Sequence, residues 1–113
     1  MGKMYKVKIT VIKKVVNKEL ADQYLKPSIA EHYDTCPLFE VGQTFIADGF
    51  LTCPKGFCYE AWQNIWPYAL AIARGGTFHP YTKEENQWIS CCTDGLKPVT
   101  FLLERGEEME LDF

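Results

Sequence analysis

The chain has 113 residues and a net charge of −3, a length that suits a single domain over residues 1–113 and a charge that argues against nucleic acid as a partner. Apolar residues make up 47% of the chain and charged residues 24%, as in ordinary globular proteins, so extensive disorder is excluded. No apolar run approaches the roughly 20 residues of a membrane helix and no signal peptide is recognisable, so we expect a cytoplasmic protein without a membrane partner.

The first half of the chain predicts a strand, a short helix and a second strand. Apolar and polar residues alternate from Tyr5 to Val11, which is typical of a half-buried strand. A short helix is expected over residues 17–25, because an asparagine can cap its start and Pro27 blocks its extension. Residues 28–41 show no usable period and predict a loop, and a short strand follows over residues 44–47.

The clearest predicted element is a helix from about Tyr59 to Arg74. Its apolar residues recur at the helical spacing i, i+3, i+4, i+7, and they are Trp62, Ile65, Trp66, Ala69, Leu70 and Ala73. The Gly75-Gly76 pair supplies a stop signal. Pro67 lies inside the helix and lacks a backbone donor, so we expect a kink there or two abutting helices.

The last third of the chain predicts a hairpin. Strands are expected over residues 88–92 and 99–103, joined through the turn signal Thr93-Asp94-Gly95. The acidic tail over residues 106–113 is expected to fray. This order of elements predicts the α+β class: a small antiparallel sheet of about four strands, one long helix packed on it, and a short N-terminal helix.

The chain contains five cysteines, an odd number, and no export signal, so thiols or metal ligands are favoured over a disulfide framework. Cys53 and Cys58 flank a Pro/Gly turn with four residues between them, a spacing that can direct two thiolates toward one ion. Cys36 precedes a proline in a loop, where ligands are often presented. The alternative is that the cysteines pack as small apolar residues of the core.

Cys91 and Cys92 are adjacent on a predicted strand, so their side chains should point to opposite faces. Cys92 abuts the predicted turn, and we expect it to join a shared site. Cys91 should share a face with Ile89 and belong to the core. His79, which follows the long helix, is a candidate base or fourth ligand, with a surface-loop histidine as the alternative.

A set of motifs in a fixed order covers nearly the whole chain: Cys36-Pro37, residues 41–45, residues 56–62, residues 68–70 with 75–78, Cys92-Thr93-Asp94, and residues 98–101. Together they resemble a numbered family of small, uncharacterised, cysteine-containing proteins found mainly in anaerobic bacteria and archaea. The resemblance implies family cysteines at positions 36, 58 and 92, with Cys53 and Cys91 as additions. The chain departs from the family at Tyr59-Glu60, where Pro-Trp is common, and at Thr93, where proline is common.

Three functions remain open at this point. The first is a metal-binding accessory protein, in which Cys36, Cys58 and Cys92 hold zinc or an iron–sulfur cluster and Cys53 or His79 supplies a fourth ligand. The second is a small enzyme with one reactive cysteine and His79 as the base. The third is an interaction module that binds a protein partner or forms a homo-oligomer.

Overall fold

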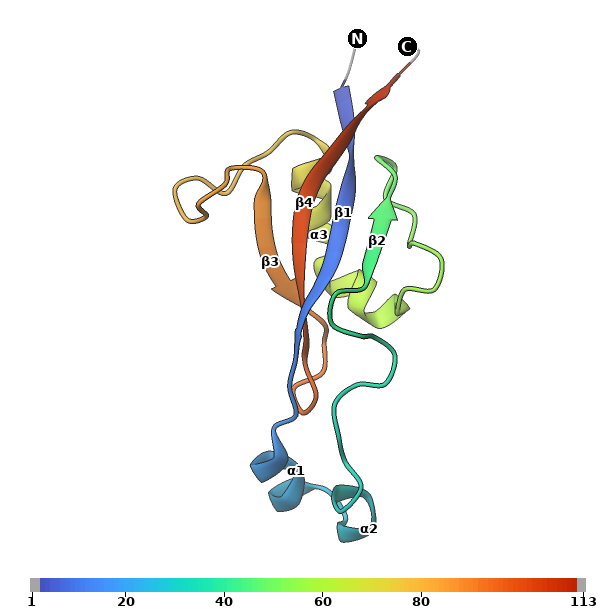
Figure 1. The fold of residues 1–113 in the computed structure, drawn as a ribbon, viewed down its shortest axis with the longest axis vertical. Helices are drawn as coiled ribbons and strands as arrows, with labels where there is room; N and C mark the ends of the chain where they lie inside the picture. Colours follow the sequence, from blue (N-terminus) through green and yellow to red (C-terminus); the bar gives the residue numbers. More distant parts are fainter. Residues whose placement is uncertain (1–2, 112–113) are drawn as a thin grey trace.

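The structure is a computed structural model that describes residues 3–111, and its centre is a four-stranded antiparallel sheet in the order β2-β1-β4-β3. The strands are β1 (Lys3–Lys14), β2 (Thr44–Ala47), β3 (Gln87–Cys91) and β4 (Val99–Glu110). The first and last strands of the chain therefore lie side by side in the middle of the sheet (Figure 1). The α+β class and the antiparallel sheet predicted from the sequence are confirmed.

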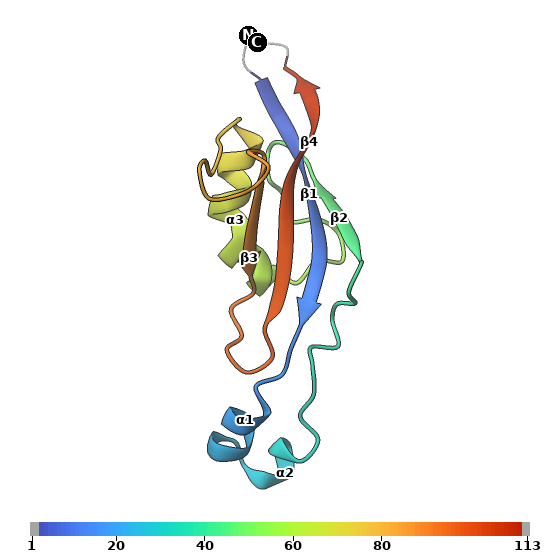
Figure 2. The ribbon, with the colours of Figure 1, turned by 60° about the vertical axis from the view of Figure 1, so that its left-hand side comes forward.

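The helix α3 (Tyr59–Ala73) packs on one face of the sheet (Figure 2). Alternation along the two central strands points Val7 and Ile9 of β1 and Phe101 and Leu103 of β4 toward this helix, and all four are fully buried. Within residues 3–111, α3 contacts β1, β3 and β4 and no other helix or strand, and no helix covers the opposite face of the sheet. That face carries exposed side chains, including Lys8, Ile12, Ile46, Ile89 and Cys91.

The helix α3 runs without interruption through Pro67, so the prediction of two abutting helices is wrong. Pro67 and Gln63 both lie on the exposed side of α3, where water can satisfy the carbonyl group that a proline four residues later leaves without a donor. The predicted apolar stripe is confirmed for Trp62, which is 5% exposed, whereas Trp66 is 38% exposed and lies at the margin of the core.

The predicted fraying of residues 106–113 is wrong for residues 106–110, which continue β4. These residues pair with the start of β1, in the register Lys3↔Glu110 and Met4↔Met109. The tail is acidic and the start of β1 is basic, so side chains of opposite charge approach each other, as in the ion pair Lys3–Glu108 at 3.6 Å. Residues 112 and 113 lie outside the described part of the chain.

Two short helices, α1 (Lys18–Tyr24) and α2 (Pro27–Ala30), form an arm that projects beyond one end of the sheet (Figure 1). The predicted short helix is confirmed, with Asn17 at the N-cap position, although its side chain makes no capping hydrogen bond. The predicted loop over residues 28–41 is wrong at its start, where α2 continues to Ala30, because Pro27 suits the first position of a helix as well as blocking extension of the one before it. Within the described residues, α1 and α2 contact each other and no other helix or strand.

The arm makes the molecule elongated. The radius of gyration is 16.3 Å, compared with about 13 to 14 Å for a compact domain of this length. Among the helices within residues 3–111, none is long and apolar enough to cross a membrane.

Candidate thiolate site

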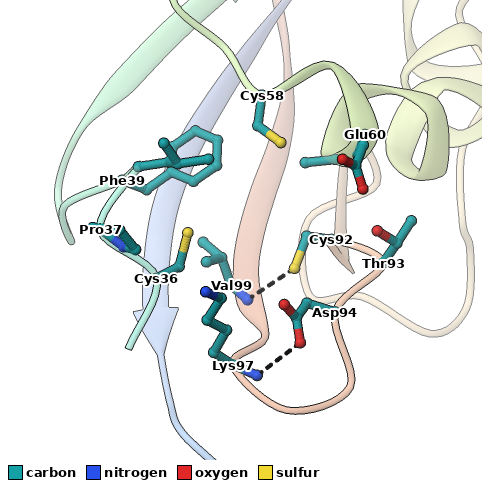
Figure 3. A pocket seen from close by; sticks show the side chains of 12 residues that line it. Cys36, Pro37, Phe39, Cys58, Glu60, Cys92, Thr93, Asp94, Lys97 and Val99 are labelled. Atoms are coloured by element: carbon teal, nitrogen blue, oxygen red, sulfur yellow. Dashed lines mark hydrogen bonds between the residues drawn. The ribbon is translucent and has the colours of Figure 1, made fainter. Parts of the chain in front are cut away.

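Three cysteines from distant parts of the chain line one cavity of about 380 Å³ beside the sheet. Cys36 comes from the loop between α2 and β2, Cys58 from the start of α3, and Cys92 from the hairpin between β3 and β4. Their sulfur atoms point toward the middle of this cavity, which we call the three-cysteine cavity (Figure 3). Each of the three residues is half-buried and its thiol is free.

The position of Cys36 depends on Phe39, three residues further along the same loop. The Phe39 side chain is 2% exposed, and its ring lies 5.1 Å from the ring of Phe57 and 5.2 Å from that of Phe101. The Lys14 Nζ of β1 donates a hydrogen bond to the Phe39 carbonyl at 2.6 Å. An irregular loop is therefore fixed to the core and to a central strand close to the sulfur of Cys36.

Cys58 is the N-cap residue of α3, with extended backbone angles. Its carbonyl accepts the first helical hydrogen bond, from Trp62 at 2.9 Å, and no side chain caps this end of the helix. The first backbone N–H groups of a helix have no intrahelical partner, and this end carries the positive pole of the helix dipole. An anionic group in the three-cysteine cavity would therefore be stabilised by α3.

Cys92 lies directly after β3 and makes two bonds with Val99, the first residue of β4. The Cys92 N–H donates to the Val99 carbonyl at 3.0 Å, and the Val99 N–H donates to the Cys92 sulfur at 3.3 Å. The Asn64 side chain of α3 donates to the Cys91 carbonyl at 2.7 Å and holds the hairpin against the helix. The sulfur of Cys92 is thus oriented by the backbone of both strands.

The rest of the cavity wall is largely apolar, with three charged side chains at its edge: Glu60, Asp94 and Lys97. Asp94 Oδ1 accepts hydrogen bonds from the N–H groups of Leu96 at 2.8 Å and Lys97 at 3.0 Å. The Lys97 ammonium lies 5.1 Å from the centre of the Tyr33 ring. Neither Glu60 nor Lys97 was predicted as a site residue, although each lies within five residues of a cavity cysteine.

The three sulfur atoms share a cavity without meeting at a point. Among residues 3–111, no group of three or more histidine, cysteine, aspartate or glutamate side chains is arranged to hold a single metal ion. The arrangement therefore offers three thiols around a space larger than one ion.

Cys53, a predicted ligand, faces a different cavity, where its neighbours are Leu51, Tyr59, Trp62, Gln63 and Trp66. Its thiol lies 3.7 Å from the Pro54 carbonyl and 3.8 Å from the Phe57 carbonyl, weak hydrogen bonds that turn it away from the three-cysteine cavity. Burial raises the pKa of the Cys53 thiol, and the nearby Cys58 raises it further.

His79, the other candidate for a fourth ligand, does not line the three-cysteine cavity. It lies beyond the C-terminal end of α3, whereas Cys58 lies at the N-terminal end, and the helix between them is about 22 Å long. The His79 side chain is 70% exposed, and its Nδ1 lies 3.7 Å from the Glu85 carboxylate. The structure therefore does not bring His79 to the cavity cysteines, either as a ligand or as a base.

The prediction that Cys91 belongs to the core is wrong, because Cys91 is exposed. It does share a face with Ile89, as strand alternation requires, but this is the face of the sheet that no helix covers. The prediction that adjacent Cys91 and Cys92 point to opposite sides is confirmed.

The fold and the cavity define a small α+β protein with three converging thiols. Comparison with known proteins adds no relative: no family model, no curated protein and no solved structure matches the chain significantly. The resemblance to a numbered family therefore stays a prediction, and the functional argument depends on the residues of this chain.

Proposed function

We propose that the chain binds a thiophilic metal cofactor, zinc or an iron–sulfur cluster, through Cys36, Cys58 and Cys92, and acts as a metal-binding accessory protein. The observation that carries this proposal is that three sulfurs from three separate segments point into one cavity. Free cysteines that act only as small apolar residues are usually fully buried, whereas each of these three is only half-buried. Zinc and iron–sulfur clusters both bind thiolates.

Two features of the surroundings support a role as ligands. The Val99 N–H donates to the Cys92 sulfur, and the uncapped N-terminus of α3 lies beside Cys58. Both place a hydrogen-bond donor or the positive pole of a helix dipole beside sulfur, which suits sulfur that is bound to a metal. Since all five cysteines are free, a reducing compartment such as the cytoplasm suits this proposal.

Elemental analysis tests the proposal on protein purified without oxygen or chelators. We expect metal in the wild type, a large loss in Cys36→Ser, Cys58→Ser and Cys92→Ser, and no loss in the matched control Cys91→Ser. Circular dichroism of each variant establishes that the fold is intact. A wild type that takes up neither zinc nor iron, or a metal content unaffected by the three substitutions, would show that the proposal is wrong.

We also propose that the arm formed by α1 and α2 contacts a protein partner, with a second copy of the chain as the first candidate. Leu20, Tyr24 and Ile29 of the arm are 43%, 72% and 50% exposed. Helices of seven and four residues are marginal on their own, so an additional contact would stabilise them. Sedimentation of the wild type should give a dimer that Leu20→Asp with Ile29→Asp dissociates, and a monomer at all concentrations would exclude the second copy.

A further inference from the structure

We infer that the cofactor of the three-cysteine cavity is an iron–sulfur cluster of the [4Fe–4S] type, with three irons held by cysteine, and not a single zinc ion. This inference rests on the proposed metal-binding function and narrows it to one class of cofactor. It follows from the spacing of the sulfurs, the size of the cavity and the hydrogen-bond donors around it.

The spacing of the three sulfurs is the first argument. A single zinc ion requires every ligand sulfur to lie about 2.3 Å from one point, which draws the sulfurs into a tight group. Within the described residues, Cys36, Cys58 and Cys92 do not form a group of that kind, although all three point into the cavity. In a cluster each cysteine sulfur binds a different iron, so the sulfurs surround a larger object and stand further apart.

The size of the cavity leads to the same choice. Its volume of about 380 Å³ lies within the range of about 300 to 1,000 Å³ that is typical of pockets for small molecules. A zinc ion bound at one wall would leave most of this space empty, or would require the Cys36 loop and the β3–β4 hairpin to close around it. Phe39 and Asn64 oppose such closure, because Phe39 anchors the loop to the core and Asn64 ties the hairpin to α3.

The donors around the cavity suit an anionic cluster. The Val99 N–H already donates to the Cys92 sulfur, and hydrogen bonds to sulfur are one means by which a protein sets the properties of a cluster. The first N–H groups of α3 have no partner within the helix, and Glu60 and Ala61 of this turn line the cavity. Backbone N–H groups at a helix N-terminus suit an anionic ligand.

Three cysteines leave one iron of such a cluster without a cysteine ligand. Glu60 and Asp94 are the carboxylates at the cavity edge, and Asp94 uses only Oδ1 in its backbone hydrogen bonds. Lys97, on the same hairpin, offsets part of the negative charge. The cluster we infer therefore has one iron with a non-cysteine ligand, either a carboxylate of this edge or a small molecule from solvent.

The test is reconstitution of the full-length, metal-free protein without oxygen, in parallel with ferrous iron plus sulfide and with zinc alone. We expect about four irons and four sulfides per chain and a broad visible absorption band. The band should be lost in Cys36→Ser, Cys58→Ser and Cys92→Ser and kept in Cys91→Ser. Alkylation of the loaded wild type followed by mass spectrometry should modify Cys53 and Cys91 and spare the other three, a readout that does not depend on how the variants fold.

The outcomes distinguish the proposed metal binding from the narrower inference of a [4Fe–4S] cluster. Zinc bound in a cysteine-dependent way, with no cysteine-dependent cluster, overturns this inference and leaves the proposed metal binding in place. Failure of both metals to protect Cys36, Cys58 and Cys92 from alkylation overturns both. Cluster formation that depends on Cys53, and leaves Cys36 free to react, also overturns the inference.

Discussion

Val99 and Cys92 form a strand pair in which a sulfur replaces a carbonyl oxygen. In a hydrogen-bonded pair of an antiparallel ladder, each residue donates its N–H to the carbonyl of the other. Here the Cys92 N–H donates to the Val99 carbonyl at 3.0 Å, but the Val99 N–H donates to the Cys92 sulfur at 3.3 Å. The Cys92 carbonyl instead lies 3.5 Å from the Asn64 amide of α3. The hairpin thus loses one standard ladder bond and places a sulfur in the three-cysteine cavity.

Cys92→Ala should lower the free energy of unfolding of the metal-free protein by about 1 to 3 kcal/mol. Val99 is 1% exposed, so its N–H would be left buried without an acceptor, and an unsatisfied buried donor carries a penalty of that size. Urea unfolding measures the effect. The matched control is Cys91→Ala, next to it but exposed, which should change stability by less than about 0.5 kcal/mol. Equal losses in the two variants would mean that the N–H···S bond contributes nothing.

Removing the metal with a chelator should lower the melting temperature of anaerobically purified protein by about 10 °C. A ligand at a hundred times its dissociation constant stabilises the folded state by about 2.7 kcal/mol, and each kcal/mol corresponds to about 4 °C in a domain of this size. Differential scanning calorimetry with and without chelator measures the shift. Cys36→Ser should show no shift, because it lacks one ligand, while Cys91→Ser should behave as the wild type.

Phe39→Ala should destabilise the protein by about 3 to 5 kcal/mol, the range for deleting a buried phenylalanine side chain. Phe39 is 2% exposed and packs against Phe45, Phe57 and Phe101. The neighbouring control Leu38→Ala should have little effect, since Leu38 is 63% exposed. Phe39→Leu keeps most of the volume and should fold, yet bind metal more weakly, because Phe39 fixes the loop that carries Cys36. Unchanged metal affinity in Phe39→Leu would contradict this positioning role.

Cys53 should alkylate at a higher pH in the folded, metal-free protein than in urea, because burial, with a smaller effect of Cys58, raises its pKa in the folded state. Only the thiolate reacts, so a raised pKa moves the dependence of the alkylation rate on pH to higher pH.

The same shift in the pKa of Cys53 makes the stability of the fold depend on pH. The stability that the neutral Cys53 thiol contributes is fully present below the pKa of this thiol in the unfolded chain, and it is lost as pH rises through the pKa in the folded state. Wild type should therefore lose more stability than Cys53→Ala between neutral and alkaline pH, and parallel losses would contradict the assignment.

Most of the fold could be predicted because it follows from local patterns. Alternation located β1 and the β3–β4 hairpin, and the apolar stripe located α3. The length of β4 could not be predicted in this way, since residues 107–110, three of which are glutamates, form a strand through pairing with the basic start of β1. The helix α2 has four residues, too few for any periodicity.

The three-cysteine cavity was predictable in part. The alternation of side chains along a strand places Cys91 and Cys92 on opposite faces of the sheet. Alternation alone does not say which face a helix will cover, so Cys91 was wrongly assigned to the buried face. Cys53 and Cys58 lie close in sequence, yet the intervening turn, with Gly56 at a φ of +81°, sends them to different cavities. The direction of a side chain beyond such a turn depends on backbone angles that residue spacing does not reveal.

Backbone amides of α1 and α2 should exchange hydrogen much faster than those of β1 and β4. The arm contacts no other helix or strand within the described residues, and its helices are too short to be stable alone, so it should open without unfolding of the sheet. Hydrogen exchange followed by mass spectrometry at two protein concentrations tests this expectation, with α3 as the internal control. If a second copy of the chain covers the arm, protection of α1 and α2 should rise with protein concentration while that of α3 stays constant. Protection equal to that of β1 at every concentration, in a protein that sediments as a monomer, would contradict the prediction, because it would require contacts between the arm and its own sheet.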